Sequence, residues 1–269
     1  MKFGADNLFK KLRSVLVSSP ENYGIGTPIN MWQEKNVGAI DQKLAVKQHG
    51  DMVQALRNEG VDCYFLEKIK GATEQKDTRD LGVISKYGAI AGHFVKDIRL
   101  GEVASFIKFC VENDIKILKY GIPFEGGDFF FIDETQCLVG IGPRTDMRPN
   151  EVETFLKRKI YIVHHSSSHH LDAFFNIISP TLVVANTKYL AEKEFLQGKK
   201  VIELDDDDIW NMSSNFLLLE ENKILADSGC HEFNEKLKNE GVEVIEVDVS
   251  ELKKNGGSIR CMTLPIFRE

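Results

Sequence analysis

Four polar motifs contain the residue types that could break a carbon–nitrogen bond. They are Thr78-Arg79-Asp80, Glu125-Gly126-Gly127-Asp128, His170-Leu171-Asp172 and the segment from Gly256 to Cys261. Together they supply a thiol, an imidazole and several carboxylates. A guanidinium group is planar, cationic and rich in donors, so a site for it needs carboxylates that accept its N–H groups. Asp80, Glu125 and Asp172 suit that role.

Cys261 and His170 could supply the reacting groups. The central carbon of a guanidinium is a poor electrophile because resonance delocalises its charge, and a thiolate attacks it better than water does. A free cysteine has a pKa of about 8.5, so Cys261 would gain from the positive field of a bound substrate or an imidazolium. His170 could protonate the departing amine and then deprotonate the water that hydrolyses a covalent thiouronium intermediate.

Taken singly, each motif has a plainer interpretation. A Gly-Gly pair beside a charged residue, as at Gly126-Gly127 and Gly256-Gly257, is usually a turn, although it also allows positive φ and close backbone approach to a ligand. A His-x-Asp pair is often an exposed loop, and an isolated cysteine is more often a small buried hydrophobe. The chemistry therefore depends on whether the fold brings the motifs together.

A repeat along the chain indicates how it could do so. Short apolar runs have starts separated by 54, 45, 40 and 42 residues, and polar turns and further strand-like segments follow them: Val61-Glu67, Ile115-Lys119, Ile160-Val163, Lys200-Leu204 and Val242-Val247. An N-terminal strand at Ser14-Ser18 and helices at Ala39-Asn58, Glu102-Glu112 and Glu232-Glu240 complete the pattern. About five similar ββαβ units in a ring would gather the polar turns at one end of a central channel. An ordinary α/β sandwich with unrelated loops is the alternative.

Composition narrows the class of protein. The chain has 269 residues, 42% of them hydrophobic, and lacks a Pro/Gly/Ser-rich linker, which predicts one domain over 1–269. The net charge of −7, without a basic block, makes nucleic acid an unfavourable partner. Apolar stretches stay short of the roughly 18 residues that cross a bilayer, so we expect a cytoplasmic protein without a membrane partner. Five scattered cysteines predict reduced thiols rather than a disulfide framework.

The ordered set TRD, EGGD, HLD and GGSIRCMT resembles the guanidine-modifying (pentein) superfamily of arginine deiminases, dimethylarginine dimethylaminohydrolases and amidinotransferases. The similarity spans Lys76 to Leu264. It implies a five-bladed α/β propeller of ββαβ units with pseudo-fivefold symmetry and a covalent cysteine mechanism without a cofactor. By position, Cys261 corresponds to the nucleophile and His170 to the general acid/base. Glu125, a member of the catalytic set, joins Asp80 and Asp172 as a guanidinium-binding carboxylate.

Two arginines extend the resemblance. Arg99, in IRLGEV, is similar to an arginine that grips the substrate α-carboxylate, and Arg144, in VGIGPRTD, is similar to the arginine of an RTN-like segment. Either could form a fork with a carboxylate. The alternative for Arg99 is a surface pair near Glu102. We expect Arg260 to point away from Cys261, because successive side chains alternate along a strand.

Two features suggest metal binding, but we predict no metal site. His164, His165, His169 and His170 crowd one segment, which the resemblance interprets as a loop with one catalytic histidine. The acidic run Asp205–Asp208 lacks the glycine and terminal glutamate of a dedicated calcium loop, so it is expected to be a solvated turn or a helix start.

The substrate is left open among several guanidino compounds. The compact length resembles the dimethylarginine hydrolases, TRD resembles the deiminases, and Pro28–Trp32 resembles the start of the arginine dihydrolases, which have asparagine where this chain has Asp80. Hydrolysis of L-arginine to citrulline and ammonia is our first expectation, methylated arginine the second and amidinotransfer the third. A non-catalytic binder of the same fold is the alternative from another class. A homo-oligomer is possible, and Tyr23–Gly26 is a candidate lid.

Overall fold

The computed structural model describes residues 1–119, 123–167 and 169–269. These residues form five three-stranded sheets, and each sheet joins an antiparallel pair to a third, parallel strand. In spatial order the sheets are β3 (Gly82–Ser85), β4 (Gly88–Ala91), β5 (Ile117–Lys119); β6 (Phe129–Phe131), β7 (Gln136–Ile141), β8 (Lys159–His164); β9 (Phe175–Ser179), β10 (Leu182–Ala185), β11 (Lys200–Glu203); β12 (Leu217–Glu220), β13 (Lys223–Asp227), β14 (Glu243–Val247); and β15 (Leu264–Arg268), β1 (Leu12–Val17), β2 (Asp62–Phe65).

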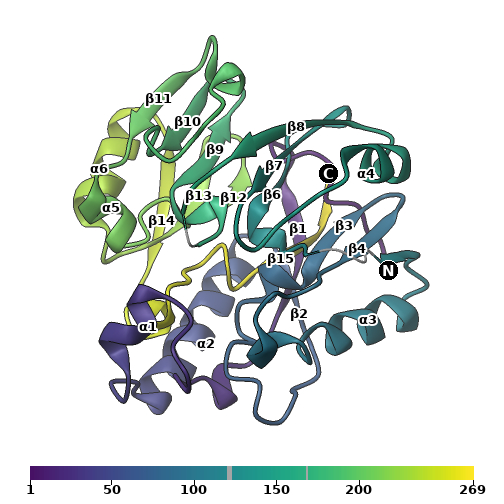
Figure 1. Cartoon of the computed structure of the whole chain (residues 1–269). Coiled ribbons are helices and arrows are strands. Elements are labelled where there is room, and N and C mark those ends of the chain that lie inside the picture. Colours follow the sequence, from purple (N-terminus) through teal and green to yellow (C-terminus); the bar gives the residue numbers. More distant parts are fainter. Residues whose placement is uncertain (120–122, 168) are drawn as a thin grey trace.

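The third strand of each sheet follows a crossover, which carries a helix in four sheets. These helices are α2 (Gln42–Asn58), α3 (Val103–Glu112), α4 (Pro149–Leu156) and α6 (His231–Asn239), and they lie on the outside of the molecule (Figure 1). Between β10 and β11 only a 3-10 turn, Glu194–Leu196, takes that place. Two shorter helices, α1 (Met31–Asn36) and α5 (Asp206–Trp210), complete the fold.

Helix α2 shows how the sequence produces these outer helices. Asp41 is its N-cap, and the Asp41 carboxylate accepts hydrogen bonds from the backbone amides of Lys43 and Leu44, which satisfies donors that a helix start leaves free. One face buries apolar side chains such as Met52 and Leu56. The helix therefore covers its sheet with one face and presents the other to solvent.

The sheet β15-β1-β2 closes the ring. Strand β15, near the end of the chain, pairs antiparallel with β1, with Leu16 opposite Leu264 and Val15 opposite Pro265. The two strands lie side by side in the middle of the molecule in Figure 1. Pro265 has no N–H to donate, and it is tolerated here because β15 is an edge strand of its sheet.

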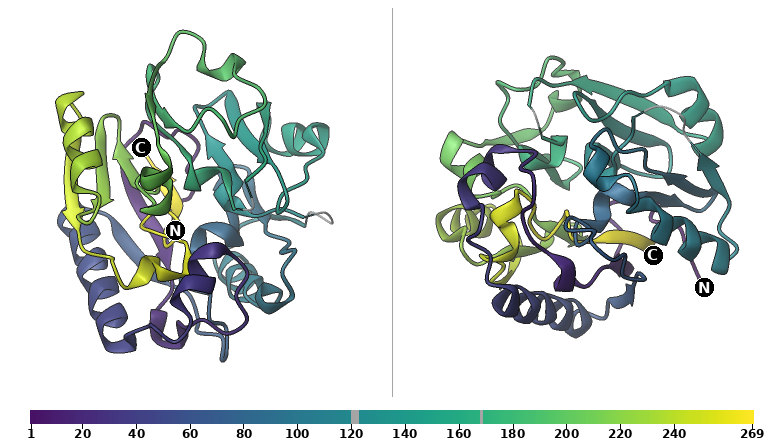
Figure 2. Two further views of the ribbon diagram at one scale, coloured as in Figure 1. Left: turned by 60° about the vertical axis from the view of Figure 1, so that its left-hand side comes forward. Right: turned by 60° about the horizontal axis from the view of Figure 1, so that its bottom comes forward.

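The inner strands of the sheets, such as β6, are buried on both faces. Phe129 and Phe131 of β6 lie on one face, with ring centroids 4.9 Å apart, whereas Phe130 packs against Phe175 on the other face at 5.4 Å. Since side chains alternate along a strand, three consecutive buried phenylalanines require apolar neighbours on both sides. The core is accordingly distributed between neighbouring sheets. Figure 2 shows two further views of how these sheets are arranged.

The predicted α/β propeller with pseudo-fivefold symmetry is confirmed, and the sandwich alternative is wrong. Four of the predicted apolar runs contain the third strand of a sheet, and the fifth, Ile160-Val163, lies within β8. The predicted helices correspond to α2, α3 and α6. The acidic run begins helix α5, where Asp205 and Asp208 form a reciprocal capping box. Among the described residues, no helix is long and apolar enough to cross a membrane.

Candidate active site

The predicted site motifs occupy equivalent places in the repeat. Asp80 lies in the 3-10 turn Thr78–Leu81 before β3, Glu125 precedes the turn Gly126–Asp128 before β6, and Asp172 lies in the turn Leu171–Ala173 before β9. Cys261 lies in a turn directly before β15. Because each segment enters the first strand of its sheet, the ring brings these side chains together at the centre.

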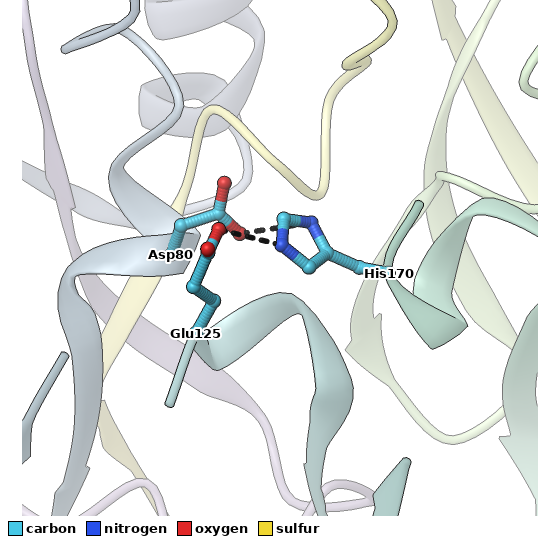
Figure 3. Close-up of side chains that lie close together, drawn as sticks. All are labelled: Asp80, Glu125 and His170. Atoms are coloured by element: carbon cyan, nitrogen blue, oxygen red, sulfur yellow. Dashed lines mark hydrogen bonds and ion pairs between the residues drawn. The ribbon is translucent and has the colours of Figure 1, made fainter. Parts of the chain in front are cut away.

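Two carboxylates, those of Asp80 and Glu125, face the imidazole of His170 from the same side (Figure 3). Its Nε2 lies 2.7 Å from Glu125 Oε2, and its Nδ1 lies 3.4 Å from Asp80 Oδ1. Burial opposes the charged imidazolium, but Asp80 and Glu125 outweigh that effect and raise the pKa of His170 to about 9. His170 is therefore a cation at neutral pH and can act as an acid.

Asp80 is ionised in the same network. Burial alone would raise the pKa of its carboxyl, but the charges of His170 and Arg99 lower that pKa to about 2. Arg99 Nη1 lies 2.6 Å from Asp80 Oδ2. The site thus holds its carboxylate and its imidazolium in opposite charge states that stabilise each other.

Cys261 is 2% exposed and contacts two polar side chains. Asn215 Nδ2 donates to Cys261 Sγ at 3.2 Å, and both carboxylate oxygens of Asp172 lie 3.9 Å from the sulfur. Burial, followed by the negative charges of Asp172, Asp80 and Asp77, raises the pKa of Cys261 well above its usual value. Without a bound cation, the group is a neutral thiol.

Asn215 was not among the predicted site residues. Its Oδ1 accepts hydrogen bonds from the backbone amides of Ser258 and Cys261, each at 3.1 Å, so it fixes the loop that carries the thiol. It belongs to the polar segment NMSSN, which precedes β12 as the other motifs precede their strands. That equivalent position was the sequence signal that could have identified it.

The strand that we predicted at Arg260 is wrong. Residues 258–263 form a turn rather than a strand, with the amide of Met262 bonded to the carbonyl of Ser258. The Arg260 side chain enters the core, where Nε donates to Asp172 Oδ2 at 3.2 Å and the guanidinium lies 3.9 Å from the centre of the Phe130 ring. Strand alternation does not apply in a turn, and Arg260 balances the charge of the carboxylate beside Cys261.

Arg99 and Arg144 line the same pocket but differ in their free donors. Arg99 is buried, and its guanidinium lies 2.6 Å from Asp80 and 2.9 Å from Glu102, so the surface-pair alternative is wrong. Arg144 Nη1 lies 3.5 Å from Glu125 Oε2, whereas its Nε and Nη2 are buried without a partner in the described part of the chain. Arg144 therefore has more donors available to a ligand than Arg99.

The pocket between these groups is nearly closed. It leaves a cavity of about 10 Å³, which is about the room of one water molecule. Ile29 and Asn30 form part of its wall, a few residues after the candidate lid. Within that lid Tyr23 is buried, with its hydroxyl near the carbonyls of Glu251 and Leu252. A substrate of arginine size needs the wall to move, and the lid stays a prediction.

The crowded histidines do not converge. His164 is exposed and lies 2.8 Å from Glu192, His165 lies 3.3 Å from Asp128, and the His169 ring contacts the Gly256 carbonyl at 2.5 Å. A different group, Asp80, Glu125 and His170, places ligand atoms within 4.8 Å of one another. The Arg99 guanidinium already supplies a cation to this group, 2.6 Å from Asp80 and 3.7 Å from Glu125.

Gly127 leaves the space that the ring of His170 occupies. Replacing Gly127 with alanine is expected to reduce activity. A Cβ at this position would lie 2.8 Å from His170 Cγ and 2.9 Å from Asp80 Oδ1, closer than carbon atoms can pack. We expect Gly127→Ala to lower kcat about 10- to 100-fold through misplacement of the imidazole, measured as initial rates on the protein's best guanidino substrate. In the control Gly50→Ala, an exposed helical position with open space, the rate should be unchanged.

Comparison with known proteins identifies the family. A family model described as N,N dimethylarginine dimethylhydrolase, eukaryotic, matches residues 21–268. The chain belongs to this family, within the guanidine-modifying superfamily that its motifs resemble. Family membership places it among hydrolases that act on C–N bonds of guanidino groups.

Proteins similar to this member of the dimethylarginine hydrolase family occur in several organisms. The uncharacterized protein YkgA of Bacillus subtilis is 31% identical over 265 residues, which cover 96% of this chain and 92% of YkgA. The bifunctional arginine dihydrolase/ornithine cyclodeaminase ArgZ of Synechocystis is 25% identical over 94% of this chain, which spans 37% of ArgZ.

Solved structures agree on the fold. The product-bound N-terminal domain of ArgZ, a cyanobacterial arginine dihydrolase, superposes with a TM-score of 0.87 at 23% identity, covering 95% of this chain and 97% of that domain. A Pseudomonas aeruginosa dimethylarginine dimethylaminohydrolase mutant with citrulline gives 0.79 at 18% identity, covering 96% of this chain and all of the other.

Proposed function

We propose that this protein hydrolyses the guanidinium group of L-arginine, or of a close relative, to a ureido group and ammonia, with citrulline as the product from arginine. The observation that carries this proposal is the enclosure of a thiol, an imidazolium and carboxylates in one buried pocket. Cys261, His170 and Glu125 form the catalytic set, and Asp80 and Asp172 accept the guanidinium N–H groups. Arg144, two of whose nitrogens have no partner among the described residues, is better suited than Arg99 to bind the substrate carboxylate.

The bound guanidinium activates its own nucleophile. Its positive charge offsets the negative field of Asp172 and Asp80 that holds the Cys261 proton, so that proton is lost to solvent on binding. The thiolate then forms a bond to the guanidinium carbon and gives a neutral tetrahedral intermediate. Substrate binding and deprotonation are thereby coupled, and the resting thiol is protected from unwanted reactions.

His170 serves both halves of the reaction. The imidazolium gives its proton to one amino group, the C–N bond breaks, ammonia departs and a thiouronium cation remains on Cys261. The neutral imidazole then takes a proton from water as the water oxygen bonds to the same carbon. Collapse of that second intermediate breaks the C–S bond, and its hydroxyl proton passes to the departing sulfur. The ureido product is released and the neutral thiol of Cys261 is restored.

Methylated arginine is the second candidate, because the matching family model is that of dimethylarginine hydrolases. The mechanism is unchanged, and the leaving group becomes methylamine or dimethylamine instead of ammonia. The chemistry at Cys261 is shared by both substrates, so the size of the space around the leaving nitrogen decides between them.

Product analysis separates these functions. Purified protein is incubated with L-arginine, methylarginines, agmatine or an arginine–glycine mixture, and ammonia, methylamines, citrulline, ornithine and transferred amidine are quantified. We expect citrulline and ammonia in equal amounts from arginine. Methylamines would select the second candidate, and ornithine with a new guanidino compound would select amidinotransfer. Absence of any product from the whole panel would contradict the proposal.

A further inference from the structure

A second cavity lies inside the ring, behind the substrate pocket. It has a volume of about 20 Å³, and strands β3, β6 and β15 form most of its wall. Three arginine side chains also line it: Arg79, Arg260 and Arg268. None of the described residues in this wall belongs to the wall of the substrate pocket. We call this space the channel cavity.

The N-terminal segment covers the channel cavity from one side. The backbone amides of Gly4, Ala5 and Leu8 donate to carbonyls within β15, within β3 and directly after β6. The site motifs precede the same three strands, so the segment lies on the side away from the substrate pocket. A group inside the channel cavity is therefore shielded from solvent as well as from the substrate.

The arginines of this cavity outnumber their carboxylate partners. Arg79, Arg260 and Arg268 are 6%, 3% and 5% exposed. Asp172 lies 3.2 Å from Arg260 and is the one acidic side chain within salt-bridge distance of any of them in the described ranges. Three guanidinium groups and one carboxylate leave a net charge of +2. Buried charges cost free energy unless an opposite charge lies close by.

The hydrogen bonds of Arg268 and Arg79 differ. Arg268 Nη1 donates to the carbonyls of Leu8 and Lys10 at 3.0 and 2.9 Å. Arg79 Nε donates to the carbonyl of Arg260 at 3.4 Å, and Arg79 Nη2 is buried without a partner among the residues that the structure describes. Buried N–H groups of native proteins nearly always have an acceptor. Arg79 therefore offers a donor to a group inside the channel cavity.

The electrostatic field at the cavity favours an anion over a water molecule. Burial and then the charge of Arg260 lower the pKa of Arg268 to about 9, and the same two effects lower the pKa of Arg79. Arginine keeps its proton at neutral pH, so a counter-charge relieves this field better than loss of a proton does. Water accepts a hydrogen bond but brings no charge. The cavity has room for about one or two water-sized groups, which excludes sulfate and phosphate.

We propose that the channel cavity binds one small inorganic anion of the size of chloride. The anion accepts a hydrogen bond from Arg79 Nη2 and lowers the net charge of the four side chains from +2 to +1. Arg260 pairs with Asp172 beside Cys261, so the ion stabilises the protein directly behind the candidate active site. The ion takes no part in the reaction, and this inference does not depend on the proposed function.

Crystals of the wild-type protein test the proposal without any substitution. One set is grown from chloride and measured at long X-ray wavelength, where chloride scatters anomalously. A second set is grown after dialysis into bromide and measured at the bromine absorption edge. We expect an anomalous peak in the channel cavity beside Arg79 Nη2 in at least one set, and the chloride set detects an ion that does not exchange. Density without an anomalous signal in both sets, as water gives, would overturn the proposal.

Thermal unfolding tests the same site in solution. At constant ionic strength, with gluconate as the balancing anion, raising chloride from about 1 to about 100 mM should raise the wild-type Tm by about 2–6 °C, because the ion binds only the folded state. Arg79→Met removes the charge and should lose this dependence. Arg57→Met, at an exposed position of α2, is the matched control and should keep it. A wild-type Tm that ignores chloride, or an unchanged dependence in Arg79→Met, would contradict the proposal. If Arg79→Met does not fold, the crystals and the wild-type Tm decide.

Discussion

Replacing Cys261 with serine is expected to abolish turnover of every guanidino substrate, a loss on the order of 10⁴-fold or more in kcat. A serine hydroxyl ionises far less readily than a thiol, and the field of Asp172 and Asp80 that raises the thiol pKa would oppose an alkoxide even more. The measurement is citrulline formation at saturating arginine. Mass spectrometry of trapped wild type should also show a covalent adduct on the peptide that contains Cys261, which the variant lacks.

The matched control is Cys63→Ser. Cys63 is half-buried on β2, and its sulfur lies 3.7 Å from the carbonyl of Val61, so the substitution tests the loss of a thiol away from the pocket. It should keep the wild-type rate. If Cys261→Ser retained more than about one per cent of the wild-type kcat, Cys261 would not be the nucleophile. Slow labelling of Cys261 at neutral pH, accelerated by a guanidinium ligand, would support activation of the thiol by the substrate.

Replacing His170 with asparagine is expected to lower kcat about 10²- to 10⁴-fold, because the leaving amine and the attacking water both lose their proton partner. The pH dependence identifies the cause. Since the pKa of His170 is about 9, the wild-type step that needs an imidazolium should weaken as pH rises through 9. The pH–rate profile of His170→Asn, measured by stopped-time citrulline assays over pH 6–10, should lack this decrease near pH 9.

The same group contributes to stability with a defined sign. The pKa of His170 is higher in the folded protein, about 9, than its ordinary value of 6.5. Its contribution is therefore fully present below about pH 6.5 and is lost as pH rises through 9. Wild type should lose thermal stability over that range relative to His170→Asn. Glu125→Gln removes the carboxylate that contacts the His170 imidazole, so the loss of thermal stability should begin at a lower pH. A His170→Asn profile parallel to wild type would contradict this account.

The repeat and most of the site could be predicted from the sequence because both depend on local pattern. The apolar runs at Val61 and Val242 contain β2 and β14, because short runs of β-branched, aromatic and aliphatic residues favour strands. The polar motifs share a position before the first strand of each sheet, so a repeat in sequence becomes a cluster in space.

Polar side-chain contacts between different sheets of the ring could not be predicted in the same way. The contacts of Arg260 with Asp172 and of Asn215 with Cys261 join segments that are 88 and 46 residues apart. No local period encodes such pairs. The 3-10 turn that takes the place of a helix between β10 and β11 could not be predicted either. Only the complete ring shows that so short a segment is enough at that crossover.

The position of Cys261, the proposed nucleophile, in the segment that closes the ring has a consequence for synthesis. Cys261 directly precedes β15, the strand that joins β1, and β1 has one edge without a partner until β15 is available. Four sheets of a growing chain are therefore able to form before Cys261 has been made. The nascent chain lacks the proposed nucleophile, and the open edge of β1 is available to neighbouring chains until β15 has been made.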